Sequence, residues 1–493
     1  MPKRHVSLST GRVARNLLAG ALLPILAGCA SYSPAPIDPH TLHAEWFALD
    51  ARRATEAVAA ALPERTAAEP GFNLDDGITL AEAETAALFL NPEMARLRAS
   101  LGVSLATARS AGDWQDPALG VDGDHVLASI PDRLTWSGSL SITIPLSGRP
   151  GLERRLAEAQ LERGEAIALG AEWALVADLR REWLQLAQVD ARILLIEGAI
   201  TDLDRLVEAS PAFKAARAMS VVEERLLLLG RARAKEERLT ALAERAEWRL
   251  MILSRLGLHP DHNWRLIASM PDVTTIEDPS HSAPDFEALL AHPSLSIAMA
   301  AYAVAERTLA REVRRQIPDL TIGLGAGRED GDSTLVFGLG LLPIPIWNRN
   351  REGIATAEAE RAAARIETES ILRDLVGRRA IEHAHFHSAR ERLVFLENEV
   401  APLADAKLDD ARRLTALGRL DLILLVEAVE EQRRVRLELL GARAAALDAQ
   451  ISLEALTAPC PTHLAVSPEG LFHDHKAGNA TPPTELSPTE SRD

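Results

Sequence analysis

The sequence predicts a mainly helical protein with some β-structure, built from a duplicated unit of one helix, one β-hairpin and two long helices. The first observation is an internal repeat, in which landmarks recur at an offset of about 200 residues. The second is a set of strand-like runs in which apolar residues alternate with Ser, Thr or Gly. The third is the length of the helical patterns, which no compact domain would accommodate.

The repeat rests on three short landmarks. They are Asn-Pro and His-Pro at 91–92 and 292–293, Gln-x-Pro at 115–117 and 316–318, and Ile-Pro at 144–145 and 344–345. The offset is 201 residues for the first two landmarks and 200 for the third. A period this long indicates two copies of a whole domain rather than a solenoid. We assign copy one to 78–257 and copy two to 283–458, joined by a linker at 258–282.

Composition and charge exclude several classes of function. The chain has 493 residues, of which 47% are hydrophobic and only 4% aromatic, and its formal net charge is −17. Nucleic acid is excluded as a partner because phosphate binding needs clustered Lys and Arg. The sequence has no nucleophile elbow, phosphate loop or dinucleotide fingerprint. We therefore expect no enzymatic activity and no cofactor.

The first 28 residues have the pattern of a lipoprotein signal peptide. Basic residues precede a short apolar run at 17–26, which is too short to cross a membrane. The run ends in Leu-Ala-Gly followed by Cys29, which resembles the bacterial lipobox. Acylation of Cys29 would anchor the chain on the periplasmic side, and Ala30 at the next position indicates the outer membrane of a Gram-negative cell. The alternative is an ordinary signal peptide with a chance cysteine.

The two ends of the mature chain are rich in residues that disfavour packed structure. Residues 29–77 are rich in Pro and Ala, and we expect a lipid-anchored extended segment with one short helix near 45–61. Residues 459–493 are rich in Pro, Ser, Thr and Glu and are predicted to be a disordered tail. Cys460 lies in this tail and is given no role.

Each copy begins with a helix and continues with two strands. The helices are predicted at 80–112 and 286–316, each ended by a proline. In the strand that follows, Ser137, Ser139 and Ser141 alternate with Leu140 and Ile142, which gives one polar and one apolar face. Copy two shows the same alternation at 320–327 and 335–342, with Gly on the small face. The connecting turns are predicted at 127–133 and 328–332.

The strands have the length and the two-faced pattern of strands that span a membrane. Four strands cannot close a barrel, and an open edge is not tolerated in lipid. Strands that span must therefore be completed by other copies, and three chains would supply twelve strands. The alternative is an ordinary amphipathic hairpin packed on a soluble core.

Two very long helices follow the strands in each copy. We predict them at 150–209 and 220–256 in copy one, and at 349–400 and 421–458 in copy two. In the first of these, Val176, Leu179, Trp183 and Leu186 recur at spacings of three and four, as in a coiled-coil seam. About 60 residues of helix extend for about 90 Å, a length suited to a tube.

With this plan, the chain resembles the outer membrane efflux protein family, the TolC-like outer membrane factors, in their lipidated branch. The resemblance covers 78–458 and includes the run Ile-Pro-Ile-Trp-Asn-Arg-Asn-Arg at 344–351 and Leu-Gly-Arg-Leu-Asp at 417–421. It implies a homotrimer, with a 12-stranded β-barrel in the outer membrane lipid that is continued by a periplasmic α-helical barrel. It also implies two protein partners, a periplasmic adaptor and an inner-membrane pump of the resistance-nodulation-division type.

The resemblance assigns roles to two groups of residues. Pro345, Trp347, Asn348 and Arg349 form the junction where the second hairpin returns to a helix; Pro345 suits the end of a strand, and Asn348 is expected to cap the helix. The second group is the tip between the last two helices, which is expected to contact the adaptor. It contains Gly418, Arg419, Leu420 and Asp421, with Ser220 at the equivalent place in copy one. Gly418 permits a left-handed turn, and Asp421 and Ser220 can cap the helices that follow.

Two further features have competing interpretations. Glu427 follows the tip by about two helical turns, where three copies would form an acidic ring that favours cations; the alternative is a solvated surface residue. His383, His385 and His387 alternate on a helix, and the first and third could share a metal. We favour an ordinary helix face for the histidines and expect no metal site.

Two other classes of protein were weighed. A lipid-anchored periplasmic adaptor would have one helical hairpin flanked by other domains, rather than two full copies with serine-rich hairpins. A lipid-anchored periplasmic enzyme would need a catalytic cluster, and the sequence offers no candidate. The efflux channel is therefore the preferred prediction.

Overall fold

The computed structural model describes residues 32–61, 73–126, 133–215, 219–271, 286–329, 332–339, 345–416 and 422–457. The chain divides into two compact units, 1–49 and 50–493, and each is described by itself. The first unit contains helix α2 (Pro39–Phe47), whose N-terminus is capped by the carboxylate of Asp38. The second begins with α3 (Ala51–Ala61). The segment predicted to be mainly extended thus contains two helices, and the helix expected near 45–61 is divided between them.

Each copy of the duplicated unit contains the predicted order of elements. Copy one has α4 (Leu80–Leu90), α5 (Pro92–Ser110), β1 (Ala118–Val126), β2 (Arg133–Ile144), α6 (Arg149–Ala215) and α7 (Val221–Arg255). Copy two has α8 (Phe286–Leu290), α9 (Pro293–Arg314), β3 (Leu320–Glu329), β4 (Asp332–Leu339), α10 (Arg351–Phe395), a short π-helix η3 (Leu396–Val400), α11 (Ala401–Ala416) and α12 (Leu422–Thr457). The prediction of a mainly helical, duplicated fold is confirmed.

The four strands form one antiparallel sheet in the order β1-β2-β3-β4. The two hairpins pair with each other through β2 and β3, where Ile144 is opposite Leu320 and Trp136 is opposite Arg328. Strands β3 and β4 extend further into the second predicted turn than expected, because Glu329 still pairs with Asp332. The sheet therefore has β1 at one edge and β4 at the other in the part of the chain that is described.

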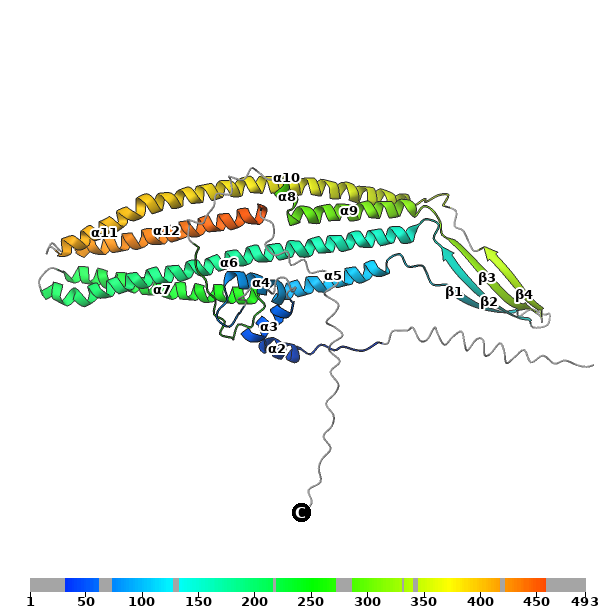
Figure 1. Ribbon diagram of the computed structural model, residues 1–493, viewed down its shortest axis with the longest axis horizontal. Coiled ribbons are helices and arrows are strands. Elements are labelled where there is room, and N and C mark those ends of the chain that lie inside the picture. Colours follow the sequence, from blue (N-terminus) through cyan, green and yellow to red (C-terminus); the bar gives the residue numbers. More distant parts are fainter. Residues whose placement is uncertain are drawn as a thin grey trace, which may run out of the picture. The chain divides into compact units, whose positions relative to one another are not determined.

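The helices continue the same lateral order. Helix α6 packs against α5 and α7 on one side and against α9 and α12 on the other, and α9 and α12 pack in turn against α10. Within this second unit, the sheet lies at one end of the long helices, and the facing ends of α6 and α7 and of α11 and α12 lie at the opposite end (Figure 1). Among the described residues, no helix has the length and apolar content needed to cross a membrane.

The first helix of each copy is interrupted, which corrects the prediction of continuous helices at 80–112 and 286–316. Asn91 accepts hydrogen bonds from the backbone N–H groups of Glu93 and Met94 at 2.8 and 3.1 Å, and so caps α5. His292 caps α9 in the same way, with Nδ1 accepting from the N–H of Ser294 at 3.2 Å. In both places the following proline occupies the first helical position, where no N–H is needed.

Two long helices extend beyond the ends that we predict for them, and each contains a proline in the added part. Helix α6 runs to Ala215 through Pro211 rather than ending near 209. The helix that starts at α10 does not end at Val400, because η3 inserts a wider turn and α11 carries on to Ala416. In η3 the N–H of Ala401 bonds to the carbonyl of Leu396, five residues back. This wider register accommodates Pro402 without breaking the rod.

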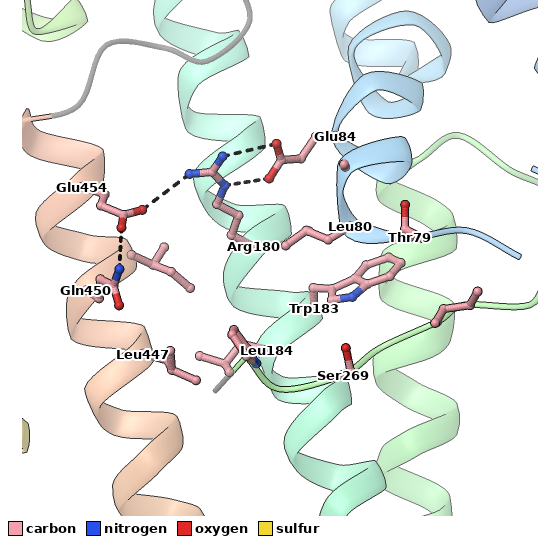
Figure 2. A pocket seen from close by; sticks show the side chains of 14 residues that line it. Thr79, Leu80, Glu84, Arg180, Trp183, Leu184, Ser269, Leu447, Gln450 and Glu454 are labelled. Atoms are coloured by element: carbon pink, nitrogen blue, oxygen red, sulfur yellow. Dashed lines mark hydrogen bonds and ion pairs between the residues drawn. The ribbon is translucent and has the colours of Figure 1, made fainter. Parts of the chain in front are cut away.

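A cavity of about 640 Å³ lies where α4, α6, α12 and the segment after α7 meet. Figure 2 shows Arg180 between Glu84 and Glu454, with its guanidinium toward both carboxylates. Arg180 Nε donates to Glu84 at 2.6 Å, and its guanidinium is 3.7 Å from Glu454. The cluster links α4 and α6 of copy one to the last helix of copy two, α12, and its side chains are engaged with one another.

Candidate functional site

The strand-to-helix junction of copy two has an unusual backbone. Arg349 and Asn350 both have positive φ, 44° and 50°, a conformation that Asn tolerates better than most residues. Helix α10 begins at Arg351, so Asn350 occupies the N-cap position and makes no side-chain capping bond. The prediction that Asn348 caps this helix is therefore wrong, because the left-handed turn moves the helix start two residues later.

The side chain of Asn350 instead bonds to α9. Its Nδ2 donates to the main-chain carbonyl of Glu312 at 2.9 Å and to the carboxylate at 2.8 Å. Arg311 also donates two hydrogen bonds to the Glu312 carboxylate, at 2.9 and 3.1 Å. Glu312 as a whole is only 6% exposed. Burial alone would raise the pKa of Glu312, but the hydrogen bonds from Asn350 and Arg311 and the charges of Arg311 and Arg315 hold it below its ordinary value.

Large apolar side chains are exposed where the strands join the helices. Trp347 is 85% exposed and Trp114, which precedes β1, is 58% exposed. Three aliphatic residues at the same end of the sheet are also exposed: Leu146, Ile317 and Ile346. Pro345 adjoins this group, immediately before Ile346. Such residues are costly in water, and Trp in particular is enriched at membrane–water interfaces.

The sheet itself has one exposed apolar face. Leu119 is opposite Leu140 in the β1–β2 register, and Leu140 is opposite Leu324 in the β2–β3 register, so the three form one row across the sheet. They are between 50% and 76% exposed, and Val121 and Ile142 extend the same face. A face of this kind on an otherwise paired sheet has no packing partner within the described chain.

The other face carries small and polar residues. Gly120 is opposite Ser139, Ser139 is opposite Gly325, and Ser141 is opposite Gly323. The hydroxyls of Thr143 and Thr321 are 3.1 Å apart. The predicted division between an apolar face and a Ser/Gly face is thus present in the paired strands, and it matches the pattern of strands with lipid on one side and water on the other.

At the opposite end of the long helices, Ser220 caps α7. Its Oγ accepts from the N–H of Glu223 at 3.2 Å, and the Glu223 carboxylate accepts from the N–H of Ser220 at 2.6 Å. This is a complete capping box. The copy-two tip residues Gly418, Arg419, Leu420 and Asp421 lie outside the described residues, as do Cys29 and Cys460.

A groove of about 550 Å³ separates α7 from α12 near these tips. Its lining combines aliphatic and charged side chains: Leu226, Leu229, Ile423 and Val426, with Glu223, Arg233, Glu237, Glu427, Glu430 and Arg433. Arg433 pairs with Glu237 across the groove and with Glu430 on its own helix. The groove therefore lies between α7 and α12, and an ion pair connects the two helices across it.

Glu427 lies on the rim of this groove and is paired with a residue that sequence analysis missed. Its carboxylate is 3.1 Å from Nζ of Lys407 on α11, and its side chain is 63% exposed. The pair links α11 to α12. Lys407 had no recognisable signal in the sequence, since the two residues are brought together only when α11 and α12 fold back on each other.

Known proteins match this chain in structure but not in sequence. No family model matches the chain, and no curated protein sequence matches it. Among solved structures, CusC aligns with a TM-score of 0.67 and 15% identity over 81% of this chain and 97% of CusC. VceC from Vibrio cholerae, described as an outer membrane protein, aligns with a TM-score of 0.64 and 16% identity over 76% of this chain and 95% of VceC.

The MtrE outer membrane channel of Neisseria gonorrhoeae, solved in its open state, aligns with a TM-score of 0.62 and 14% identity over 76% of this chain and 88% of its own. The chain has the fold of the TolC-like outer-membrane efflux channels. This TolC-like fold confirms the fold that the sequence motifs predicted.

Proposed function

We propose that this protein is the outer-membrane channel of a tripartite efflux system and works as a homotrimer. The observation that carries the proposal is the sheet. It presents a continuous apolar row on one face and Ser, Thr and Gly on the other, and each of its outer strands has one paired neighbour in the described chain. In lipid, such edges must be paired, so β1 of one copy would join β4 of the next.

The helices favour the same mode of assembly. One lateral edge of the layer is formed by α5 and α7, and the other by α10 and α11. Both edges expose large aliphatic side chains: Val103, Leu239 and Leu250 on the first, and Ile366, Ile381 and Leu403 on the second. Two different edges that contact each other form a heterologous interface, which closes into a ring at a suitable angle. Three copies of a four-stranded sheet would give a barrel of twelve strands.

In this assembly the helical tips would contact a periplasmic adaptor, which links the channel to an inner-membrane pump of the resistance-nodulation-division type. The start of α7, where Ser220 caps the helix and Val221 and Val222 are exposed, suits contact with a helical hairpin of the adaptor. Cys29 would carry the lipid anchor on the periplasmic side of the outer membrane, and Glu427 would contribute to an acidic ring in the pore. The pump supplies the energy, and the channel conducts.

The experiment places one lysine on each face of β2. Leu140→Lys puts a charge on the proposed lipid face, at an expected cost of about 2–4 kcal/mol per chain in mid-membrane. Ser137→Lys adds the same charge on the proposed lumen face, where water solvates it. We expect Leu140→Lys to abolish the heat-modifiable trimer in outer-membrane fractions and Ser137→Lys to preserve it. Equal behaviour of the two variants would contradict a membrane-spanning sheet.

A further inference from the structure

Two histidines on α10 lie side by side, one helical turn apart. The ring centres of His383 and His387 are 4.5 Å from each other, and the ring planes are inclined by 63°. Both side chains are half-buried. His385 is exposed and is paired with Glu382 at 3.6 Å. The helix therefore separates the three histidines into one close pair and one single residue.

The spacing of the pair matches that of two imidazoles on one metal ion. With metal–nitrogen bonds of about 2.0–2.1 Å, two imidazoles bound at a right angle have ring centres about 4.5 Å apart. A tetrahedral angle would separate the centres by about 5.2 Å. A separation of 4.5 Å therefore keeps the two rings close enough to bind one metal ion, and imidazole nitrogen is a suitable ligand for Cu²⁺, Ni²⁺ and Zn²⁺.

The surroundings restrict the movement of the two rings. Phe386, one residue before His387, is fully buried and belongs to the same apolar cluster as Ala442 and Ala446 of α12. Its ring contacts that of His387, with centres 6.0 Å apart. A backbone fixed in a long helix and a ring held by a core residue reduce the conformational entropy that ligand ordering would otherwise cost.

The protein offers two ligands here rather than a full coordination shell. In the described parts of the chain, no group of three or more His, Cys, Asp and Glu side chains is placed to hold a metal ion. Along the same face, Arg379 lies one turn before His383 and Glu391 one turn after His387, so their charges oppose each other. Water would complete the coordination, and an ion held by two imidazoles exchanges readily.

We propose that His383 and His387 form a bidentate site for a late divalent transition-metal ion such as Cu²⁺ or Ni²⁺. The site is an exchangeable binding position on the face of α10, not a structural metal centre. It does not depend on the protein's being a channel, because both ligands belong to one helix of one chain. Cu²⁺ binds more tightly than Ni²⁺, in keeping with the general order of affinities for nitrogen ligands.

The test measures Cu²⁺ bound to the full-length purified protein by electron paramagnetic resonance and equilibrium dialysis. The starting protein carries His473→Asn and His475→Asn, which removes another closely spaced pair in the sequence. Into it we introduce His383→Asn, His387→Asn or, as the matched control on the same helix, His385→Asn. Circular dichroism verifies that each variant retains its helices.

We expect His383→Asn and His387→Asn each to weaken one Cu²⁺ site per chain by about a hundredfold, because the second ligand acts intramolecularly at high effective concentration. The nitrogen splitting from this ion should fall from two coupled nitrogens to one. His385→Asn should leave the affinity and the spectrum unchanged. The proposal is overturned if all three variants bind the same amount of Cu²⁺ with the same affinity as the starting protein.

Discussion

Asn350 and Glu312 join the start of α10 to the end of α9 through two hydrogen bonds from a single side-chain amide, 2.9 Å to the carbonyl and 2.8 Å to the carboxylate. The first residue is in a left-handed conformation and the second is almost fully buried. The chain leaves β4 and re-enters a helix at this point. The pair therefore fixes the direction in which the sheet connects to the long helices.

Asn350→Ala should destabilise the protein by about 2–3 kcal/mol. The substitution leaves the buried carboxylate of Glu312 with one hydrogen-bond donor fewer. It also puts alanine in a left-handed conformation, which asparagine tolerates better because its side chain can form local hydrogen bonds. Asn350→Gly, the matched variant, removes the same hydrogen bonds but tolerates the backbone, and should cost less. Thermal unfolding followed by circular dichroism measures both. If the two variants are equally stable, the conformation of residue 350 contributes nothing.

This contact also shows where sequence reasoning ends. The alternation of Ser137, Ser139 and Ser141 with apolar neighbours is a local pattern, and it was enough to predict the two-faced strand. The capping box at Ser220 is equally local, since its partner Glu223 is three residues away. Such features follow from short-range geometry and can be identified before any tertiary structure is known.

Features that depend on distant segments could not be predicted. Asn350 and Glu312 are 38 residues apart, and the capping role given to Asn348 failed because the left-handed turn is stabilised by that distant contact. Helix ends were also placed too early, at 209 and 400. Both helices continue through a proline, Pro211 or Pro402, because packing along the rod outweighs the local cost of proline inside a helix.

Arg98 and Glu172 form a buried pair between α5 and α6 that we expect to be costly. Their charged atoms are 3.7 Å apart, and the side chains are 14% and 10% exposed. Burial lowers the pKa of Arg98 and raises that of Glu172, in each case against the attraction of the partner. Both shifts indicate that desolvation outweighs the attraction.

Glu172→Gln should therefore destabilise the protein by about 3–5 kcal/mol, because the buried Arg98 is left without a counter-charge. The double variant Arg98→Met, Glu172→Leu should be as stable as the original chain or more so. Denaturant titration of the three proteins measures the difference. A double variant that is less stable than Glu172→Gln would show that the ion pair itself stabilises this contact.

Glu427 offers a test of the proposed pore ring through its partner Lys407. In planar bilayers, Glu427→Gln should reduce the preference for K⁺ over Cl⁻, seen as a shift of the reversal potential toward zero. Lys407→Gln should increase that preference, because it removes the cation 3.1 Å from the carboxylate. The control is Asp409→Asn, which removes one negative charge from an exposed residue of α11. Equal shifts for Glu427→Gln and Asp409→Asn would assign Glu427 to the solvated surface.

His292 makes stability depend on pH at the start of α9. Burial lowers the pKa of this imidazole below 6.5, and the nearby charge of Arg378 lowers it further. In the unfolded chain the imidazole takes up a proton near its ordinary pKa of about 6.5, whereas in the fold it resists protonation until lower pH. Between the lowered pKa of the folded state and the pKa of about 6.5 in the unfolded state, the unfolded chain binds more protons. The stabilising contribution of neutral His292 is therefore complete above about pH 6.5 and is lost as the pH falls toward the folded-state pKa.

Protonation would also remove the acceptor that caps α9, since Nδ1 accepts from the N–H of Ser294. His292→Asn should abolish this part of the pH dependence while keeping the cap, because Asn91 caps α5 in the same position of copy one. The measurement is the melting temperature of both proteins between pH 7.5 and pH 5. We expect the original chain to lose more stability than the variant over this interval, and parallel curves would mean that His292 does not titrate differently on folding.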